Sequence, residues 1–377
     1  MGITTATAPP HHDAFRGWLA RGLAGAGEEW LSRHEPLRRS AAALLDGVRS
    51  VVMLATDHAT ASMAAPSDSR SGRGRIARYA QGDDYHDLLR SRVNALSAWL
   101  ESRVPGCRTR GVVDSAPIAE RDFAWLAGLG WIGKNAMLIH PGAGSYFLIT
   151  TFLTDVPLPP DGPIHTDHCG TCTACLDACP TGAFPEPGVV DAGRCISSLT
   201  IEHRGPVPEA LRTSLGDWVF GCDVCQEVCP WNRHAPGSDE PAFQPRGGDP
   251  TLDLVEILTL DDAAFRLRFR GTAMFRAKRG GLVRSAAMAL GNHPHTPAFS
   301  SLAALLADED PTVRDAAAWA LGRWIDAGVL VEDCREVLGH AAATLGGTRA
   351  GVGHQPVSQS PVSSMSLDGS RPGPSVP

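Results

Sequence analysis

The feature that most constrains this chain is a run of closely spaced cysteines in its middle. Four of them occur as Cys169-x2-Cys172-x2-Cys175-x3-Cys179, followed directly by Pro180. Three thiolates at this spacing can wrap one iron–sulfur cubane, while the fourth reaches a second cluster. The proline removes a backbone N–H and turns the chain away. The run therefore predicts [4Fe–4S] clusters.

A second run, Cys222-x2-Cys225-x3-Cys229-Pro230, lacks one cysteine of the full pattern, and Cys195 is the obvious supplier. In two-cluster ferredoxins the last cysteine of a run ligates the other cluster. The predicted ligands are Cys169, Cys172, Cys175 and Cys229 for the first cluster, and Cys179, Cys195, Cys222 and Cys225 for the second. A pair of structural zinc sites is the alternative, but such sites do not need two runs that end in Cys-Pro. Cys107 and Cys334 lie outside the pattern and are expected to be buried, inert thiols.

Length and charge limit the remaining possibilities. A chain of 377 residues is long enough for two or three domains, and its net charge of −7 argues against wholesale nucleic-acid binding. No apolar run approaches the roughly 18 residues that span a bilayer. Residues 1–13 contain no basic region followed by an apolar core, so we expect no secretory signal. Because disulfides are rare in a reducing compartment, ten cysteines predict a cytoplasmic metalloprotein with no membrane contact.

Apolar spacing predicts a mixed domain over residues 1–158. Strands that alternate with helices are typical of an α/β or α+β fold. A loop rich in Ser, Gly and Arg is expected over 66–75. The expected helices are 14–47, 85–103 and 123–129, and the expected strands are 50–55, 111–114, 137–139 and 146–153.

Proline-rich segments divide the rest of the chain. Linkers at 157–163 and 235–250 delimit a cluster domain over 159–235. The helices expected at 283–291 and 313–322 are near copies, which indicates a HEAT-like repeat pair over 250–345, although two unrelated Ala-rich helices would look similar. Residues 346–377 are rich in Gly, Ser and Pro, and we expect a disordered tail. The fold class is therefore predicted as α+β multidomain, with an α/β domain, a ferredoxin-like two-cluster domain and C-terminal HEAT-like helical repeats.

Two segments of the first domain are candidates for chemistry. Asp114 ends an expected strand, where an acid commonly faces a ligand crevice, although it could equally cap the next helix. The segment 128–135, Gly-Leu-Gly-Trp-Ile-Gly-Lys-Asn, is glycine-rich but lacks P-loop spacing. It could place Lys134 near a phosphate, or it could be a tight turn with a surface lysine.

A basic stretch lies beside the expected repeats. Seven cations and no acid occur between Phe265 and Arg284, which makes a plausible phosphate track; a solvated helix face is the alternative. His165 and His168, near the first cluster, are expected to pack rather than ligate. The cations are Arg266, Arg268, Arg270, Arg276, Lys278, Arg279 and Arg284.

Several of these stretches together resemble the epoxyqueuosine reductase family. The resemblance covers about residues 15–325. The quoted stretches are Asp114-Ser-Ala-Pro117, residues 128–135, Arg194 to Glu202, Phe220 to Gln226 with Cys229-Pro-Trp-Asn232, Gly74 to Tyr79, and Asp84-Tyr-His86.

The resemblance implies an enzyme that uses cobalamin and two [4Fe–4S] clusters to reduce epoxyqueuosine to queuosine at the wobble position of tRNA anticodons. The residue matching Asp114 is the proposed proton donor of that family. For this role the carboxyl must be protonated when substrate binds, so we expect burial against the corrin and the base to raise the pKa of Asp114. By the same resemblance, the cobalamin contacts are expected to be Asp114, Leu138, Ile149, Ser197, Cys222 and Asp223. Met1-Gly-Ile-Thr is expected to be the remnant of an N-terminal strand.

The implied partners are the tRNA anticodon stem-loop and an electron donor of unknown identity, and we expect a monomer. Two other functions fit part of the pattern. A cobalamin-dependent reductive dehalogenase would share the cofactors but leave the basic stretch and repeats unexplained. A non-catalytic electron-transfer protein would leave the first 158 residues without a role.

Overall fold

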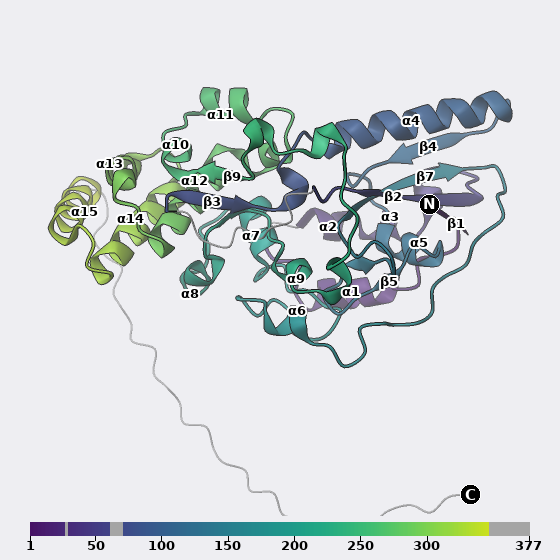
Figure 1. The fold of residues 1–377 in the computed structure, drawn as a ribbon, viewed down its shortest axis with the longest axis horizontal. Helices are drawn as coiled ribbons and strands as arrows, with labels where there is room; N and C mark the ends of the chain where they lie inside the picture. The colour runs from purple at the N-terminus through teal and green to yellow at the C-terminus, as the bar shows by residue number, and fades with distance from the viewer. Residues whose placement is uncertain (27–28, 61–70, 347–377) are drawn as a thin grey trace, which may run out of the picture.

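The computed structural model describes residues 1–26, 29–60 and 71–346, with side chains up to residue 343. The molecule is elongated, with a β-sheet at one end and stacked helices at the other (Figure 1). No helix in these ranges is long and apolar enough to cross a membrane.

A four-stranded sheet forms the N-terminal part, and all its strand pairs are antiparallel. Alternate residues of β2 pack on opposite faces, since Val51 and Met53 join the core that contains α5, whereas Val52 joins the core that contains α4. The expected strand at the N-terminus is the edge strand β1. The strands, in sheet order, are β1 (Gly2–Thr5), β2 (Ser50–Asp57), β7 (Phe147–Thr154) and β4 (Thr109–Val112).

The helices around this sheet differ from the sequence prediction in one place. The helix expected over 85–103 is α4 (Tyr85–Arg103), and α5 (Glu120–Leu126) lies slightly before its expected position. The long helical stretch predicted over 14–47 is wrong, because Gly22 and Gly25 adopt positive φ and end the first helix. That stretch contains α1 (His12–Ala20), α2 (Glu29–Arg33), α3 (Glu35–Arg38) and the 3-10 turn η1 (Ala41–Ala43).

A second sheet joins segments that are far apart in the sequence. Its central strand β3 (Arg73–Ile76) pairs in parallel with β8 (Trp218–Phe220) and antiparallel with β9 (Thr251–Asp253). The N-terminal part, the cysteine segment and the C-terminal helices therefore share one sheet and one large core. The loop predicted over 66–75 is replaced by strand from Arg73 onward, and 61–70 lie outside the described residues.

The cysteine segment contains only short helices, several of which begin within or directly after a cysteine run. The segment predicted as a linker over 235–250 packs onto the first domain, because Phe243 is buried beside α4. The short elements are α6 (Ala174–Asp177), α7 (Ile196–Ile201), α8 (Glu209–Arg212), η3 (Thr213–Leu215), α9 (Val224–Glu227), η4 (Pro230–Asn232), η5 (Pro241–Phe243) and η6 (Arg246–Gly248).

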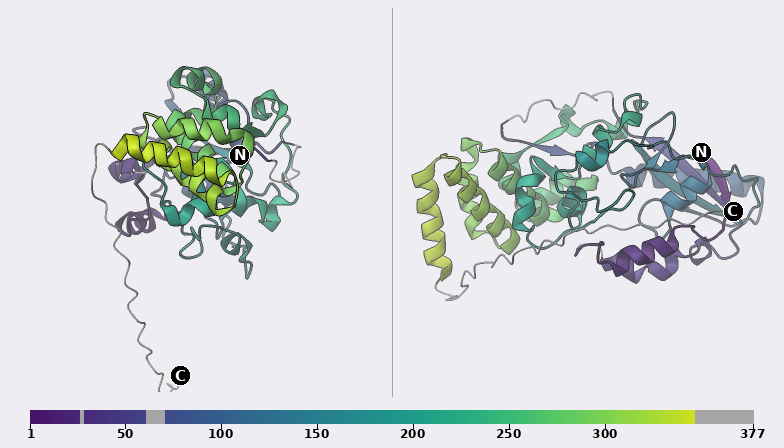
Figure 2. Two further views of the ribbon diagram at one scale, coloured as in Figure 1. Left: turned by 90° about the vertical axis from the view of Figure 1, so that its left-hand side faces the viewer. Right: turned by 90° about the horizontal axis from the view of Figure 1, so that it is seen from below.

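The C-terminal part is helical, and its helices stack at one end of the molecule (Figure 2). Asp310 caps α14 by accepting the N–H of Thr312, and the buried Trp324 ties α14 to α12 by donating to the carbonyl oxygen of Leu290 at 2.7 Å. The tail predicted from 346 lies outside the described residues, apart from Gly346, which ends α15. The elements are α10 (Leu254–Leu258), α11 (Asp262–Phe269), η7 (Ala273–Ala277), α12 (Lys278–Asn292), η8 (Thr296–Ala298), α13 (Phe299–Ala304), η9 (Leu305–Ala307), α14 (Pro311–Asp326) and α15 (Val331–Gly346).

Candidate cluster centres and active site

The cysteines gather as two neighbouring groups. No disulfide links the ten cysteines, all of which lie in the described ranges. Burial raises the pKa of the Cys175 thiol, and the thiols of Cys169, Cys229 and Cys172 raise it further because they lie close by. Thiols from two distant runs therefore lie close enough to interact, which fits the first predicted ligand set.

The second group forms beside the first. Burial raises the pKa of the Cys225 thiol, and nearby Cys195 and Cys179 add to the effect; the thiol of Cys222 responds in the same way to Cys195 and Cys225. Cys175 also acts on Cys225, so the two groups are adjacent. Within the described ranges, no three or more His, Cys, Asp or Glu side chains are placed to hold a single metal ion. Of the two cysteines outside the pattern, Cys334 is buried and Cys107 is half-buried.

The hairpin of β5 (Trp131–Ile132) and β6 (Leu138–Ile139) lies against the first group. Trp131 packs with Cys229 and Cys169, and its ring centroid is 4.8 Å from that of His168. His165 likewise lies edge-on to Trp125, so both histidines have the packing role that the sequence indicated. The Lys134 ammonium donates to the backbone carbonyl oxygens of Gly170 and Cys172 in the first cysteine run.

Asp114 lies two residues beyond β4, at a strained turn. Its φ is +54°, a left-handed conformation that costs a non-glycine residue about 1 kcal/mol. The turn presents a carboxylate that is 60% exposed, and the backbone N–H of Asp114 donates to Oε1 of Glu120 at 3.1 Å. Oδ2 accepts the hydroxyl proton of Tyr85 at 2.8 Å and lies 3.5 Å from Nε2 of His86.

This arrangement sets the pKa of Asp114 in the absence of cofactor and substrate. The hydrogen bond from His86 lowers the pKa of Asp114; burial opposes this change, but the Tyr85 hydroxyl and the charges of His86 and Arg276 reinforce it. In the protein alone, the hydrogen bonds of Asp114 therefore outweigh its burial, and the raised pKa expected when corrin and base cover it stays a prediction.

The groups whose pKa is raised, so that they hold a proton, are neighbours of Asp114 and not Asp114 itself. Burial by itself would lower the pKa of His86, but hydrogen bonds to Asp114 and Asp84 raise it to about 9. Burial, followed by the charge of Asp114, raises the pKa of Glu120 to about 8. The sequence analysis assigned no role to Tyr85, His86 or Glu120, although Asp84-Tyr-His86 was among the stretches that carried the resemblance.

The residues expected to contact cobalamin do not all face open space. Leu138 is 3% exposed and packs in the core of the sheet, whereas Ile149, Ser197 and Cys222 are half-buried. Asp223 is buried and accepts the backbone N–H of Arg78 at 2.8 Å, and burial raises its pKa to about 6.

Tyr79 links the cluster side of this region to the acid. Burial raises the pKa of the Tyr79 hydroxyl, and the charges of Asp114 and Asp223 raise it further. The Tyr79 ring centroid is 5.8 Å from that of Tyr85, whose hydroxyl donates to Asp114. The residue before Tyr79, Arg78, donates its backbone N–H to Asp223, so the loop that carries Cys222 and the turn that carries Asp114 both lie near Tyr79. This placement fits a redox group that receives electrons at the second cysteine group and acts beside Asp114.

A basic cleft of about 1050 Å³ lies between α2 and the segment from α11 to α12. Arg276 lines the cleft, and its charge contributes to the lowered pKa of Asp114. Glu202 accepts two hydrogen bonds from the guanidinium of Arg276, from Nε at 3.0 Å and from Nη2 at 3.0 Å. The lining includes six cations, Arg33, Arg204, Arg266, Arg276, Lys278 and Arg279, and three acids, Glu29, Glu202 and Asp262.

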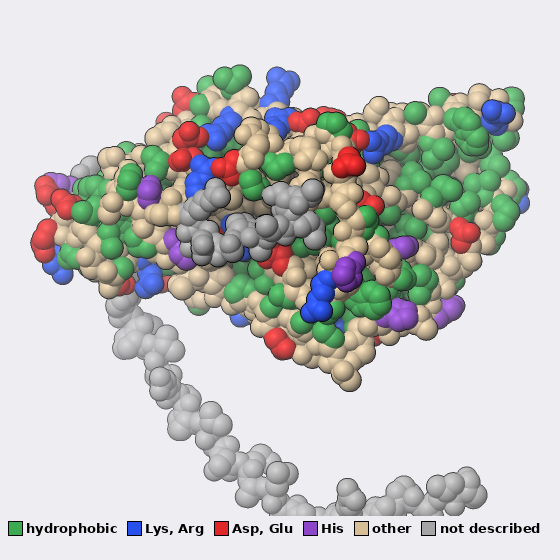
Figure 3. Space-filling view, viewed as in Figure 1, with side chains coloured by type: hydrophobic (Ala, Val, Ile, Leu, Met, Phe, Trp, Pro, Cys, Tyr) green, Lys and Arg blue, Asp and Glu red, His purple; other side chains and the backbone are tan. Residues whose placement is uncertain are grey.

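The predicted phosphate track is only partly exposed in this cleft. Arg284 is 1% exposed and donates to the carbonyl oxygens of Leu199, His203 and Gly205, so its predicted place in the track is wrong. Arg268 instead pairs with Glu256 at 2.9 Å. On the face shown in Figure 3, basic side chains around α10 and α11 alternate with acidic ones.

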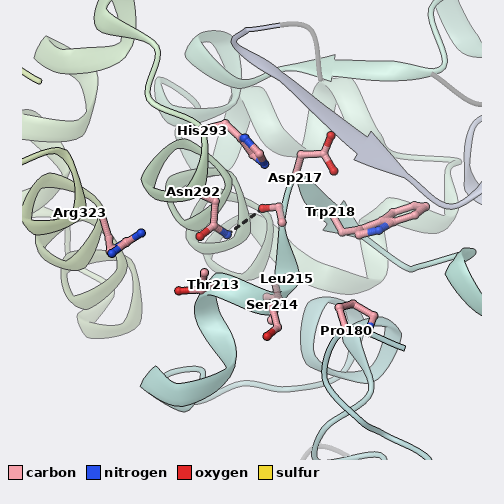
Figure 4. A pocket seen from close by; sticks show the side chains of 10 residues that line it. Pro180, Thr213, Ser214, Leu215, Asp217, Trp218, Asn292, His293 and Arg323 are labelled. Atoms are coloured by element: carbon pink, nitrogen blue, oxygen red, sulfur yellow. Dashed lines mark hydrogen bonds between the residues drawn. The ribbon is translucent and has the colours of Figure 1, made fainter. Parts of the chain in front are cut away.

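A smaller cavity of about 390 Å³ lies between the cysteine segment and the helical repeats (Figure 4). Asn292 at the end of α12 crosses this junction, and its Nδ2 donates to the carbonyl oxygens of Arg212 and Gly216, both at 2.9 Å. The cavity therefore lies at a structural joint, away from Asp114.

Three family models match successive parts of the chain. The model described as "Epoxyqueuosine reductase QueG, DUF1730" matches residues 38–115. A "4Fe-4S double cluster binding domain" matches residues 168–232, and "HEAT repeats" match residues 282–344. The last two agree with the predicted cluster chemistry and helical repeats.

Curated relatives and solved structures are similar over most of the chain. The epoxyqueuosine reductase of Xanthomonas campestris pv. campestris is 39% identical over 327 residues, covering 85% of this chain and 91% of the relative. That of Gloeobacter violaceus is 43% identical over 298 residues, covering 77% and 91%. A crystal structure of epoxyqueuosine reductase with an epoxyqueuosine-modified tRNA-Tyr stem loop has a TM-score of 0.79 at 31% identity, and the match covers 92% of this chain and 94% of that chain.

Proposed function

The chain belongs to the epoxyqueuosine reductase family and reduces epoxyqueuosine to queuosine in tRNA, and we propose that Asp114, the two cysteine groups and the basic cleft carry this reaction. The observation that supports the proposal best is the short chain of contacts through Tyr79: its ring packs on Tyr85, which donates to Asp114, and the preceding Arg78 donates its backbone N–H to Asp223. Reduction consumes two electrons and two protons, breaks both C–O bonds of the epoxide, forms a C=C bond and releases water.

The two cysteine groups would hold the two [4Fe–4S] clusters in the crossed arrangement: Cys169, Cys172, Cys175 and Cys229, then Cys179, Cys195, Cys222 and Cys225. Adjacent clusters can pass electrons one at a time toward Asp223. Cobalamin, when bound, supplies the strongly reducing, nucleophilic centre that an epoxide carbon needs. Asp114, Ile149, Ser197 and Cys222 keep exposed surface that could contact it, and Leu138 and Asp223 would support these contacts from behind.

Asp114 would deliver a proton to the epoxide oxygen as its C–O bond opens. In the protein alone the proton is held on His86, whose Nε2 lies 3.5 Å from Oδ2 of Asp114. Cofactor and base would cover the 60% of the Asp114 side chain that is exposed. Removing water from that carboxylate favours its neutral form, so the proton would move from His86 to Asp114 as substrate binds.

The basic cleft would bind the anticodon stem-loop. Phosphates carry most of the affinity in such complexes, and Arg33, Arg266 and Lys278 provide cations along the lining. Trp30 and Phe275 also line the cleft and could stack against unpaired bases.

The test uses the protein reconstituted anaerobically with iron, sulfide and cobalamin. It is incubated with tRNA that bears epoxyqueuosine and a low-potential reductant, and the nucleosides are weighed by mass spectrometry. We expect loss of one oxygen atom that depends on cobalamin, and a rate for Asp114→Asn that is lower by about 10²-fold or more. Asp87→Asn, an exposed carboxylate on α4, is the matched control. Wild-type turnover by Asp114→Asn with both cofactors bound would remove Asp114 from the reaction.

A further inference from the structure

The glycine-rich segment that the sequence analysis left without a role lies between the two cysteine groups. Lys134, in the turn between β5 and β6, donates from Nζ to the carbonyl oxygens of Gly170 at 2.6 Å and Cys172 at 2.9 Å. The next residue, Asn135, donates from Nδ2 to the carbonyl oxygen of Cys225 at 3.3 Å. This turn of the first domain therefore contacts one ligand loop of each cluster.

The backbone around Lys134 is held on both sides. The N–H of Gly133 donates to the carbonyl oxygen of Met137, and that of Ala136 donates to Gly133, both at 2.8 Å. The carbonyl oxygen of Lys134 accepts the N–H of Gly188 at 2.8 Å. The ammonium is therefore presented to the first cysteine run by a fixed turn rather than by a surface loop.

The charge of Lys134 is not neutralised by a neighbour in the structure. Within the parts of the chain that the structure describes, no acidic side chain forms an ion pair with it. The residue type is also unusual here, since only Lys134 and Lys278 among the 34 lysine and arginine residues are lysines. A compact ammonium with three donors can reach two carbonyl oxygens of one tight loop, which a planar guanidinium fits less well.

A cluster becomes more negative when it is reduced. A nearby cation stabilises the reduced form more than the oxidised form, so it raises the reduction potential, by an amount that becomes smaller as solvent exposure increases. Cys172, whose carbonyl oxygen accepts from Lys134, belongs to the first ligand set and is itself exposed. The ammonium would therefore interact most strongly with the charge of the cluster that this set holds.

We propose that Lys134 is a positioning residue for the first cluster: its ammonium orders the Gly170–Cys172 loop and raises the reduction potential of the cluster that this loop holds. Reduction of the first cluster by an external donor then becomes easier, and electrons can move on to the second group through the adjacent thiols. The proposal rests on the binding of the two clusters and not on the identity of the substrate.

The test is a redox titration of the reconstituted holoenzyme followed by electron paramagnetic resonance, without tRNA. Cys172→Ser, which perturbs the first cluster, identifies its signal. In Lys134→Met we expect the equilibrium for reducing the first cluster to weaken about tenfold, a fall of about 59 mV for a one-electron couple. Lys134→Arg, which keeps the charge, should remain closer to wild type, and the second cluster should change less.

Lys278→Met is the matched control, because it removes the other lysine from a site in the basic cleft. If Lys134→Met fails to keep full cluster content, Lys134→Gln, which retains a donor for the carbonyls, is titrated instead. An unchanged first-cluster potential in the neutral variant would overturn the proposal, as would equal shifts in the neutral and the arginine variants. Because the readout is a potential, a wrong assignment of the substrate would leave this result unaffected.

Discussion

The role of His86 as the proton store beside Asp114 can be tested by removing the charge of Asp84, which contacts His86 but not Asp114. Asp84 accepts a hydrogen bond from Nδ1 of His86 at 2.8 Å and also caps α4 by accepting the backbone N–H of His86. Asparagine caps helices as well as aspartate does, so Asp84→Asn removes the charge while keeping the cap.

The size of the effect follows from the pKa of His86, which rises from 6.5 to about 9. This rise corresponds to about 3 kcal/mol of net stabilisation of the protonated ring by its two carboxylates after burial has opposed them, and screening at Asp114, which is 60% exposed, reduces that value. If Asp84 provides about half of it, the pKa of His86 in Asp84→Asn falls by roughly one unit or more. At about pH 8, His86 is about 90% protonated in the wild type and about half protonated or less in the variant.

The assay is kcat/KM for epoxyqueuosine-tRNA between about pH 6.5 and 10 with saturating reductant. Activity should fall with increasing pH as His86 loses its proton, and this alkaline limb should move to lower pH by about one unit in Asp84→Asn. The free energy of unfolding should also fall with increasing pH. The raised pKa of His86 stabilises the fold fully below about pH 6.5, and this contribution is lost as pH rises through about 9. The control is Asp87→Asn on the same helix. An alkaline limb that stays in place in Asp84→Asn would refute the role of His86 as the proton store.

Three further outcomes are expected. Cys229→Ser should bind about half the wild-type iron and sulfide and lose the first cluster's spectrum, because Cys229 joins the thiols of the first run; iron content equal to wild type would contradict the crossed ligand sets. Trp324→Phe should lower the free energy of unfolding by about 1–3 kcal/mol in denaturant titrations, since it leaves the carbonyl oxygen of Leu290 unpaired in the core, whereas Leu267→Ala at an 88% exposed site should change it by less than about 0.5 kcal/mol. Arg266→Gln should weaken tRNA binding and reduce its salt dependence by about one unit of slope, while Arg90→Gln on α4 should not; equal salt slopes for both would argue against the basic cleft.

Much of the prediction came from the spacing of residues that are close together in the sequence. The cysteine runs specified eight thiols as two sets of four, because a ligand loop wraps its cluster with residues only two or three apart in the sequence. The spacing of apolar residues predicted α4, β2 and β7. The two nearly identical segments, 283–291 and 313–322, predicted the stacked helices α12 and α14. Each of these features depends on neighbours within one or two turns or one strand, which the sequence displays directly.

The tertiary structure decided what lies beside each of these parts. Asp114 meets Tyr85 and His86 from 29 and 28 positions earlier, and these contacts lower its pKa in the protein alone. Lys134 reaches the first cysteine run and Arg284 is buried among backbone carbonyls, although both residues look like surface cations in the sequence. The physical reason is that charge, hydrogen bonding and burial depend on distances in space, and residues far apart along the chain set those distances only when the sheets and helices pack.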